Sequence, residues 1–122
     1  MIQIKSKVRI LDNSGARIAN VINVLKKSHT SSAKIGDILV ISARRIISTT
    51  NVQKGKKYHA VVVRLKKHTF RYGGIYISFE NSAVVLLNSK NSLIATRILG
   101  VVSQDLKYSG FIKIMALAPN IV

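Results

Sequence analysis

Residues 37–65, DILVISARRIISTTNVQKGKKYHAVVVRL, decide the fold that we expect. Apolar and largely β-branched residues fill both ends of this stretch, from Asp37 to Ile47 and from Tyr58 to Leu65. Apolar runs of this kind favour β-strands over helices. The stretch therefore predicts two long strands that neighbour each other in the chain of a mainly β protein.

The residues between these two strands are polar, with Ser48–Asn51 followed by Lys54–Lys57. A strand rises about 3.3 Å per residue, so the segment from Ile46 to Tyr58 is long enough to extend well beyond the body of the protein. We therefore expect a projecting β-ribbon here, with Arg44 and Arg45 on its outgoing arm, and an ordinary hairpin is the alternative.

Shorter strands are expected on both sides of this stretch, separated by dense turn signals such as Asp12–Gly15 and Gly73-Gly74. A small closed barrel suits about six such strands, because closure removes exposed strand edges. The additional strands are predicted at residues 8–11, 16–25, 75–79 and 83–87.

The last quarter of the chain has a different pattern. Ser103 is placed as a helix N-cap before Asp105, and Gly110 is placed to end that short helix. A second short helix is expected over Phe111–Leu117. We predict one domain over residues 1–122, with the barrel in about 1–90 and a helical region in about 96–122.

The charge is the most unusual feature of the composition. Twenty Lys and Arg residues face four acids, which gives a net charge of +16 and indicates a polyanionic partner. The four acids are isolated, His29, His59 and His68 are far apart in sequence, and cysteine is absent. We therefore predict no enzyme, no metal and no cofactor. No apolar run reaches the ~18 residues of a membrane span, and only short helices are expected, so neither a membrane-spanning segment nor a membrane partner is expected.

The interval from Ile38 to Phe79 contains no acid. A solvated face normally mixes both signs of charge, so this interval predicts phosphate contact. Phe70 and Tyr72 lie among its cations, as suits base stacking, although Phe70 also fits a plug at one end of the barrel. The predicted phosphate ligands are Arg44, Arg45, Lys54, Lys56, Lys57, Arg64, Lys66, Lys67 and Arg71.

Other functions predict other sequence features. A free single-stranded RNA-binding chaperone on an OB-like barrel is the main alternative, but it needs several exposed aromatics and the chain has seven in all. A membrane-surface or lytic protein needs a long amphipathic cationic helix, whereas only short helices are expected here. A metal-dependent nuclease needs clustered acids, whereas the four acids of this chain are scattered.

Many short blocks of the chain follow one another in a distinctive order and spacing. They are Asp12–Arg17, Gly36-Asp37, Lys54-Gly55, Ala60–Arg64, Lys66-Lys67, Gly74, Phe79, Ala83, Val85–Asn88, Thr96–Ile98, Gly100 and Leu117–Pro119. In these blocks the chain resembles, over its whole length, the large-subunit ribosomal protein L-fourteen family of bacteria and organelles.

The resemblance implies a five-stranded barrel with a projecting ribbon and two short C-terminal helices, and no catalytic activity. It implies binding to large-subunit rRNA, contacts with neighbouring large-subunit ribosomal proteins and a bridge to small-subunit rRNA. Asn13, Ser14 and Arg17 of the first block join the predicted rRNA ligands. Thr96, Arg97 and Lys113 are expected on a face that meets the other subunit or a ribosome-silencing factor.

The expected compartment is the mitochondrion, with the bacterial cytoplasm and the plastid as alternatives. Ile, Lys and Asn, which have A/T-rich codons, make up 38 of 122 residues. Ala95 and Val101 replace a glycine and a proline that are usual in the family, which suggests a diverged lineage. Met1–Lys5 has no secretory or presequence pattern, so the protein is expected to act where it is made unless a presequence has been removed.

Overall fold

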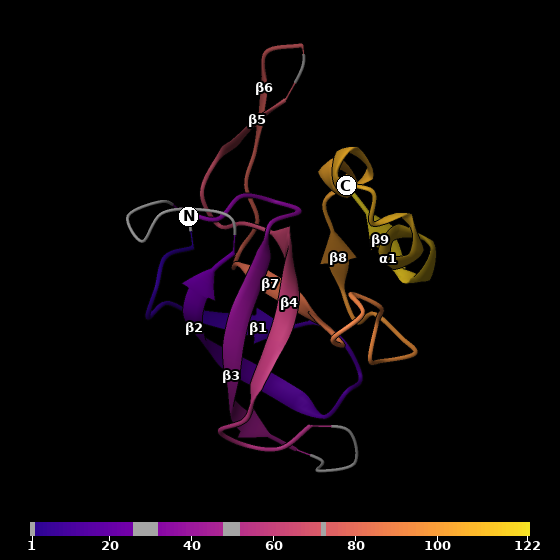
Figure 1. Cartoon of the computed structure of the whole chain (residues 1–122). Helices are drawn as coiled ribbons and strands as arrows, with labels where there is room; N and C mark the ends of the chain where they lie inside the picture. The colour runs from indigo at the N-terminus through magenta and orange to yellow at the C-terminus, as the bar shows by residue number, and fades with distance from the viewer. Residues whose placement is uncertain (1, 26–31, 48–51, 72) are drawn as a thin grey trace.

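The computed structural model describes residues 2–25, 32–47, 52–71 and 73–122. Five strands close into a barrel in the order β1-β2-β3-β4-β7 (Figure 1). Neighbouring wall strands are antiparallel, except that β7 closes the barrel by running parallel to β1. The wall strands are β1 (Lys7–Ile10), β2 (Ala16–Val24), β3 (Ile38–Ile46), β4 (Lys57–Arg64) and β7 (Ala83–Leu87).

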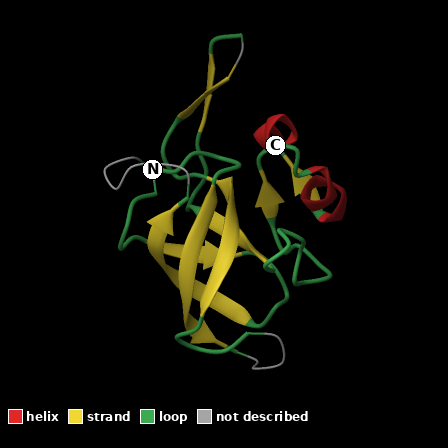
Figure 2. Cartoon of the chain, in the orientation of Figure 1, coloured by secondary structure: helices red, strands yellow, loops and turns green. Residues whose placement is uncertain are grey.

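Small pieces complete the chain. Strands β5 (Thr69–Arg71) and β6 (Ile75–Ile77) pair with each other, and β8 (Val101–Val102) pairs in parallel with β9 (Asn120–Ile121). The 3₁₀ helix η1 (Gln104–Ser109) and the helix α1 (Ile112–Leu117) lie to one side of the barrel (Figure 2). The prediction of a mainly β barrel with two short C-terminal helices is therefore confirmed.

The caps of η1 form as the sequence predicted. The Ser103 hydroxyl accepts a hydrogen bond from the amide of Asp105, and Gly110 ends the helix in the left-handed region with φ of 84°. The turn is wound as a 3₁₀ helix, which is common for such short pieces.

The projecting ribbon lies elsewhere than expected. The described residues between Ile46 and Tyr58 pack against the barrel. Val52 is fully buried, and the Gly55 amide donates to the Ala43 carbonyl at 2.9 Å. Residues 48–51 lie outside the described residues. The ribbon that does extend from the barrel is the β5–β6 hairpin (Figure 1).

The barrel wall is buried on both sides along β4 and β7. Ala60 and Val62 point into the barrel core, whereas Val61 and Val63 join a second cluster on the outside. This outer cluster includes Ile98, Leu106 and Ile114 from the segment after β7, which we call the C-terminal extension (residues 93–122). Strands buried on both faces need continuous apolar runs, which explains the Val-rich sequences of β4 and β7.

Candidate RNA-binding surface

A groove of about 840 Å³ lies on the outer wall of the barrel beside β1, β2 and β3. Four cations line it together with two aliphatic side chains, and no Asp or Glu contributes to the described lining. The lining residues are Lys7, Ile18, Arg44, Arg45, Ile46 and Lys54. A concave surface with one sign of charge raises the local concentration of an anionic partner.

The register of the sheet places cations of β1 and β3 on the same outer face of the barrel. Arg9 of β1 pairs with Ile18 of β2, and Ile18 pairs with Arg45 of β3, so the three share one row of the wall. Residues directly opposite each other in paired strands project to the same face. Lys7 is in the next outward-facing row of β1, two residues before Arg9.

A smaller hollow of about 300 Å³ continues this surface toward the base of the β5–β6 hairpin. Lys7, Arg9 and Lys66 line it, together with the acid Glu80. We call the combined surface the basic face, which comprises Lys7, Arg9, Arg44, Arg45, Lys54 and Lys66.

Lys7 and Arg9 were missed by the sequence reasoning, which looked for an acid-free interval and therefore began at Ile38. The signal was present in the alternation of β1, where Lys7 and Arg9 are exposed while Val8 and Ile10 are buried. Only the barrel pairing shows that this short strand lies next to the β2–β3 surface.

Most of the predicted phosphate ligands are exposed, and Lys56 also lies 5.9 Å from the centre of the Tyr58 ring. This distance is within the range of a cation–π contact. The exposed members are Arg44, Arg45, Lys54, Lys56, Lys57, Lys66 and Lys67, and Arg17, which the resemblance added, is exposed as well.

Arg64 has internal partners instead. Its guanidinium donates to the Val101 carbonyl at 3.1 Å and to the side-chain oxygen of Asn81, so it ties the C-terminal extension to β4. Burial, and then repulsion from Arg9, lowers the pKa of Arg64, while Glu80 acts in the opposite direction.

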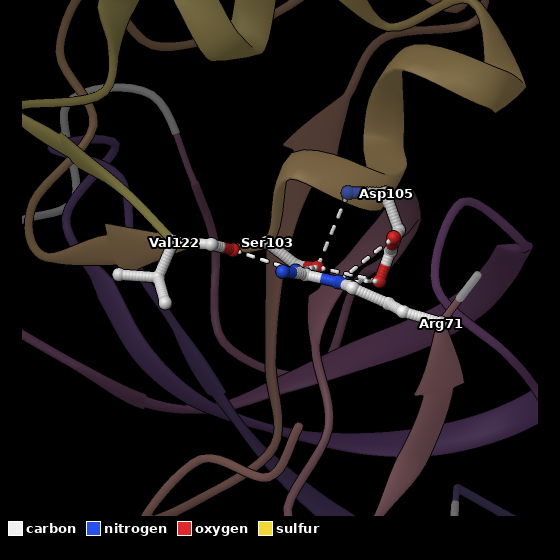
Figure 3. Close-up of polar contacts among 4 residues, drawn as sticks. All are labelled: Arg71, Ser103, Asp105 and Val122. Atoms are coloured by element: carbon white, nitrogen blue, oxygen red, sulfur yellow. Dashed lines mark hydrogen bonds and ion pairs between the residues drawn. The ribbon is translucent and has the colours of Figure 1, made fainter. Parts of the chain in front are cut away.

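Arg71 also points inward, as Figure 3 shows. Its Nε contacts both carboxylate oxygens of Asp105 at 3.1 and 3.2 Å. Its Nη2 donates to the Ser103 hydroxyl at 3.1 Å and to the main-chain oxygen of Val122 at 2.7 Å. Through these bonds the Arg71 guanidinium links the β5–β6 hairpin to the C-terminal extension. We therefore do not expect it to bind a phosphate.

The turn after β1 is also built from internal bonds. Ser14 is fully buried, and its hydroxyl donates to the buried carboxylate of Asp12, which also accepts from the Leu86 amide at 3.0 Å. Asn13 is exposed, but its side-chain oxygen accepts from the amides of Thr96 and Arg97, each at 3.1 Å. Ser14 therefore offers no surface to a partner, and Asn13 holds the Thr96–Arg97 segment in place.

Thr96, Arg97 and Lys113 are all exposed on the C-terminal extension. The residues that follow two of them, Ile98 and Ile114, belong to the same buried cluster on the outside of β4 and β7. The fold thus places the predicted interface residues on one extension.

The aromatic residues of the hairpin face solvent. Phe70 and Tyr76 are 61% and 65% exposed and meet edge to face, with ring centres 5.3 Å apart. Phe70 therefore does not plug the barrel. Tyr72 lies outside the described residues.

Neither a metal centre nor a membrane helix is found among the described residues. They contain no group of three or more His, Asp or Glu side chains that could hold a metal ion. Within the same residues, no helix is both long enough and apolar enough to cross a membrane. His29 lies outside the described residues.

Comparison with known proteins agrees with this architecture. The family described as ribosomal protein L14p/L23e matches residues 1–122. A relative from Petrotoga mobilis, named large ribosomal subunit protein uL14, is 40% identical over 121 residues, which cover 99% of each chain. The chain therefore belongs to the ribosomal protein L14p/L23e family, whose members are non-enzymatic structural proteins of the ribosome.

Proposed function

We propose that this chain binds large-subunit rRNA through the basic face. The observation that supports this most directly is the groove of about 840 Å³, lined by Lys7, Arg44, Arg45 and Lys54 without an acid. Phosphate contacts from Lys and Arg position a protein on nucleic acid without reading its sequence. Arg17, Lys56, Lys57 and Lys67 are also exposed.

A salt titration tests this proposal. Binding to a large-subunit rRNA fragment should weaken steeply between about 50 and 200 mM salt, because each phosphate contact releases counterions. The double variant Arg44→Gln with Arg45→Gln should flatten the slope of log Kd against log salt by about two. The matched pair Arg97→Gln with Lys113→Gln should leave the slope unchanged. A flat profile in the parent, or equal slopes in both pairs, contradicts the proposal.

We also propose that Thr96, Arg97 and Lys113 form a subunit-facing surface. Their exposure supports this, as does the Asn13 side chain, which fixes the backbone of Thr96 and Arg97. Small-subunit rRNA at a bridge and a ribosome-silencing factor are the proposed partners. Arg97→Glu combined with Lys113→Glu should leave large subunits assembled while joining or factor binding fails. If the double variant is instead lost from the large subunit, these residues bind large-subunit rRNA and the proposal of a subunit-facing surface is wrong.

Neighbouring large-subunit proteins are the proposed partners of the apolar part of the C-terminal extension. Several large apolar side chains there are between 44% and 69% exposed. A group of exposed apolar side chains is typical of a protein–protein contact surface. These residues are Tyr108, Ile112, Leu117, Ile121 and Val122.

We propose a mitochondrial ribosome as the compartment, with bacterial cytoplasm and plastid as alternatives. The support is the Ile, Lys and Asn content and the departures at Ala95 and Val101. Sedimentation of fractionated cells tests both compartment and function. The protein should run with the large subunit of the mitochondrial fraction, whereas free protein at the top of the gradient favours a single-strand binder.

A further inference from the structure

A second hollow, of about 500 Å³, opens on the outer wall of the barrel at β3, β4 and β7. Val40, His59 and Leu87 share one row of the pairing register across these three strands. We call this hollow the His59 pocket. Its lining residues are Val40, Lys56, Lys57, Tyr58, His59, Leu87, Asn88, Ser89 and Ile94.

The chemistry of the His59 pocket differs from that of the basic groove. Four of its lining side chains are aliphatic or aromatic, namely Val40, Tyr58, Leu87 and Ile94, whereas the groove has two. Lys56 and Lys57 are the cations, and no acid contributes to the described lining. An apolar hollow beside cations suits a flat apolar group that carries a phosphate, as a nucleotide does.

The polar groups of the pocket can also engage such a ligand. The Nδ1 atom of His59 is buried and has no hydrogen-bond partner in the described structure. Asn88 and Ser89 line the same space. The Asn88 side-chain oxygen already accepts from the amides of Lys90 and Ser92 at 2.9 and 3.0 Å, which leaves its NH2 group and the Ser89 hydroxyl for a ligand. These groups can pair with the edge of a base.

The size of the hollow is also suitable, since small-molecule sites have volumes of about 300–1,000 Å³. A base within a duplex is stacked and cannot enter a pocket, whereas a bulged or single-stranded base can be turned outward. His59 and Ser89 also line a neighbouring hollow of about 390 Å³ that contains Asp37. The phosphates therefore have their favourable approach from the side of Lys56 and Lys57.

We propose that the His59 pocket binds one unpaired nucleobase of RNA, while Lys56 and Lys57 contact the adjoining phosphates. This inference rests on the RNA binding proposed above and deepens it. The basic face holds the backbone without regard to pairing, and the His59 pocket distinguishes an unpaired base from a duplex.

The test uses the full chain with five short RNA duplexes, one perfect and four that each carry a single bulged A, C, G or U. The parent should bind at least one bulged duplex about 10-fold more tightly than the perfect duplex, as expected for one stacked base. Ser89→Trp should fill the hollow from its rim and abolish this preference, while affinity for the perfect duplex stays the same.

Ser92→Trp is the matched control, because Ser92 is an exposed serine in the same loop and does not line the pocket. It should keep the preference. Val40→Phe, which fills the hollow from β3, should act like Ser89→Trp and so guards against a local effect of tryptophan on the loop.

The outcomes separate the two proposals. Equal binding of all five duplexes by the parent, with a steep salt dependence, overturns the nucleobase pocket and leaves the basic face standing. A preference that survives both filling variants also overturns the pocket. Weak, salt-insensitive binding of every duplex overturns both.

Discussion

At the scale of single residues, Asp12 joins two parts of the fold from a buried position. Its carboxylate is 3% exposed and accepts bonds from the amide and hydroxyl of Ser14 and from the Leu86 amide of β7. Burial is the main cause that raises the pKa of Asp12 above its ordinary value of 3.8, and these hydrogen bonds oppose the increase.

This raised pKa predicts a pH-dependent stability. The folded chain takes up the Asp12 proton more readily than the unfolded chain does. The stabilising contribution of protonated Asp12 to the free energy of unfolding is therefore fully present below pH 3.8. It is lost as pH rises through the raised pKa of the folded chain. Urea unfolding of the parent and of Asp12→Asn should show the parent gaining relative stability as pH falls from about 7 to 4. A difference that is constant or reversed over this range refutes the assignment.

Arg71 and Arg45 belong to one basic interval but have different surroundings, which predicts different effects of their substitution. Arg71→Gln removes bonds to Asp105, Ser103 and Val122 and should lower the free energy of unfolding by about 1–3 kcal/mol. It should not change the salt slope of RNA binding. Arg45→Gln, at an exposed position, should flatten that slope and leave stability within about 0.5 kcal/mol. Equal effects on both measurements would contradict this division.

At the scale of elements, the β5–β6 hairpin is the part that leaves the barrel. Its turn carries two glycines with positive φ, 94° at Gly73 and 78° at Gly74. A Cβ added at either position meets no other atom within 4 Å, so a substitution is opposed by backbone conformation rather than by crowding.

Gly74→Val should therefore strain the turn by about 1–3 kcal/mol, whereas Gly73→Asn should cost much less, because Asn tolerates positive φ. Since the turn lies at the tip of the hairpin, we expect faster amide hydrogen exchange in β5 and β6 together with a lower melting temperature. Unchanged exchange and melting in Gly74→Val would show that this turn needs no special backbone conformation.

At the scale of the whole molecule, the C-terminal extension covers the outer face of β4 and β7. Leu106 and Ile114 are almost fully buried against the outside of β4 and β7. Arg64 and Arg71 add polar links between the extension and the rest of the chain. An exposed Val-rich sheet face favours aggregation, so covering it also protects the fold.

Residues 1–122 should consequently unfold as one cooperative unit. Leu106→Ala should lower the free energy of unfolding by about 2–5 kcal/mol, because it leaves a cavity between the extension and β4–β7. Circular dichroism, which reports mainly the barrel, and the fluorescence of Tyr108 in a variant with its other tyrosines replaced should give one coincident transition. Two separate transitions would indicate that the extension is an independent unit.

The sequence by itself determined the fold class, the wall strands, the two short helices and the basic character. These features follow from local patterns, since runs of β-branched residues favour strands and Ser103 and Gly110 suit helix caps. The whole-chain resemblance carried the family.

Only the tertiary structure decided where the ribbon projects and which cations are exposed. Strand pairing joined Lys7 and Arg9 to Arg45, and packing of the extension turned Arg64 and Arg71 inward. These outcomes depend on contacts between residues far apart in sequence. The sequence alone does not show whether a guanidinium contacts water, a phosphate or a carboxylate such as that of Asp105.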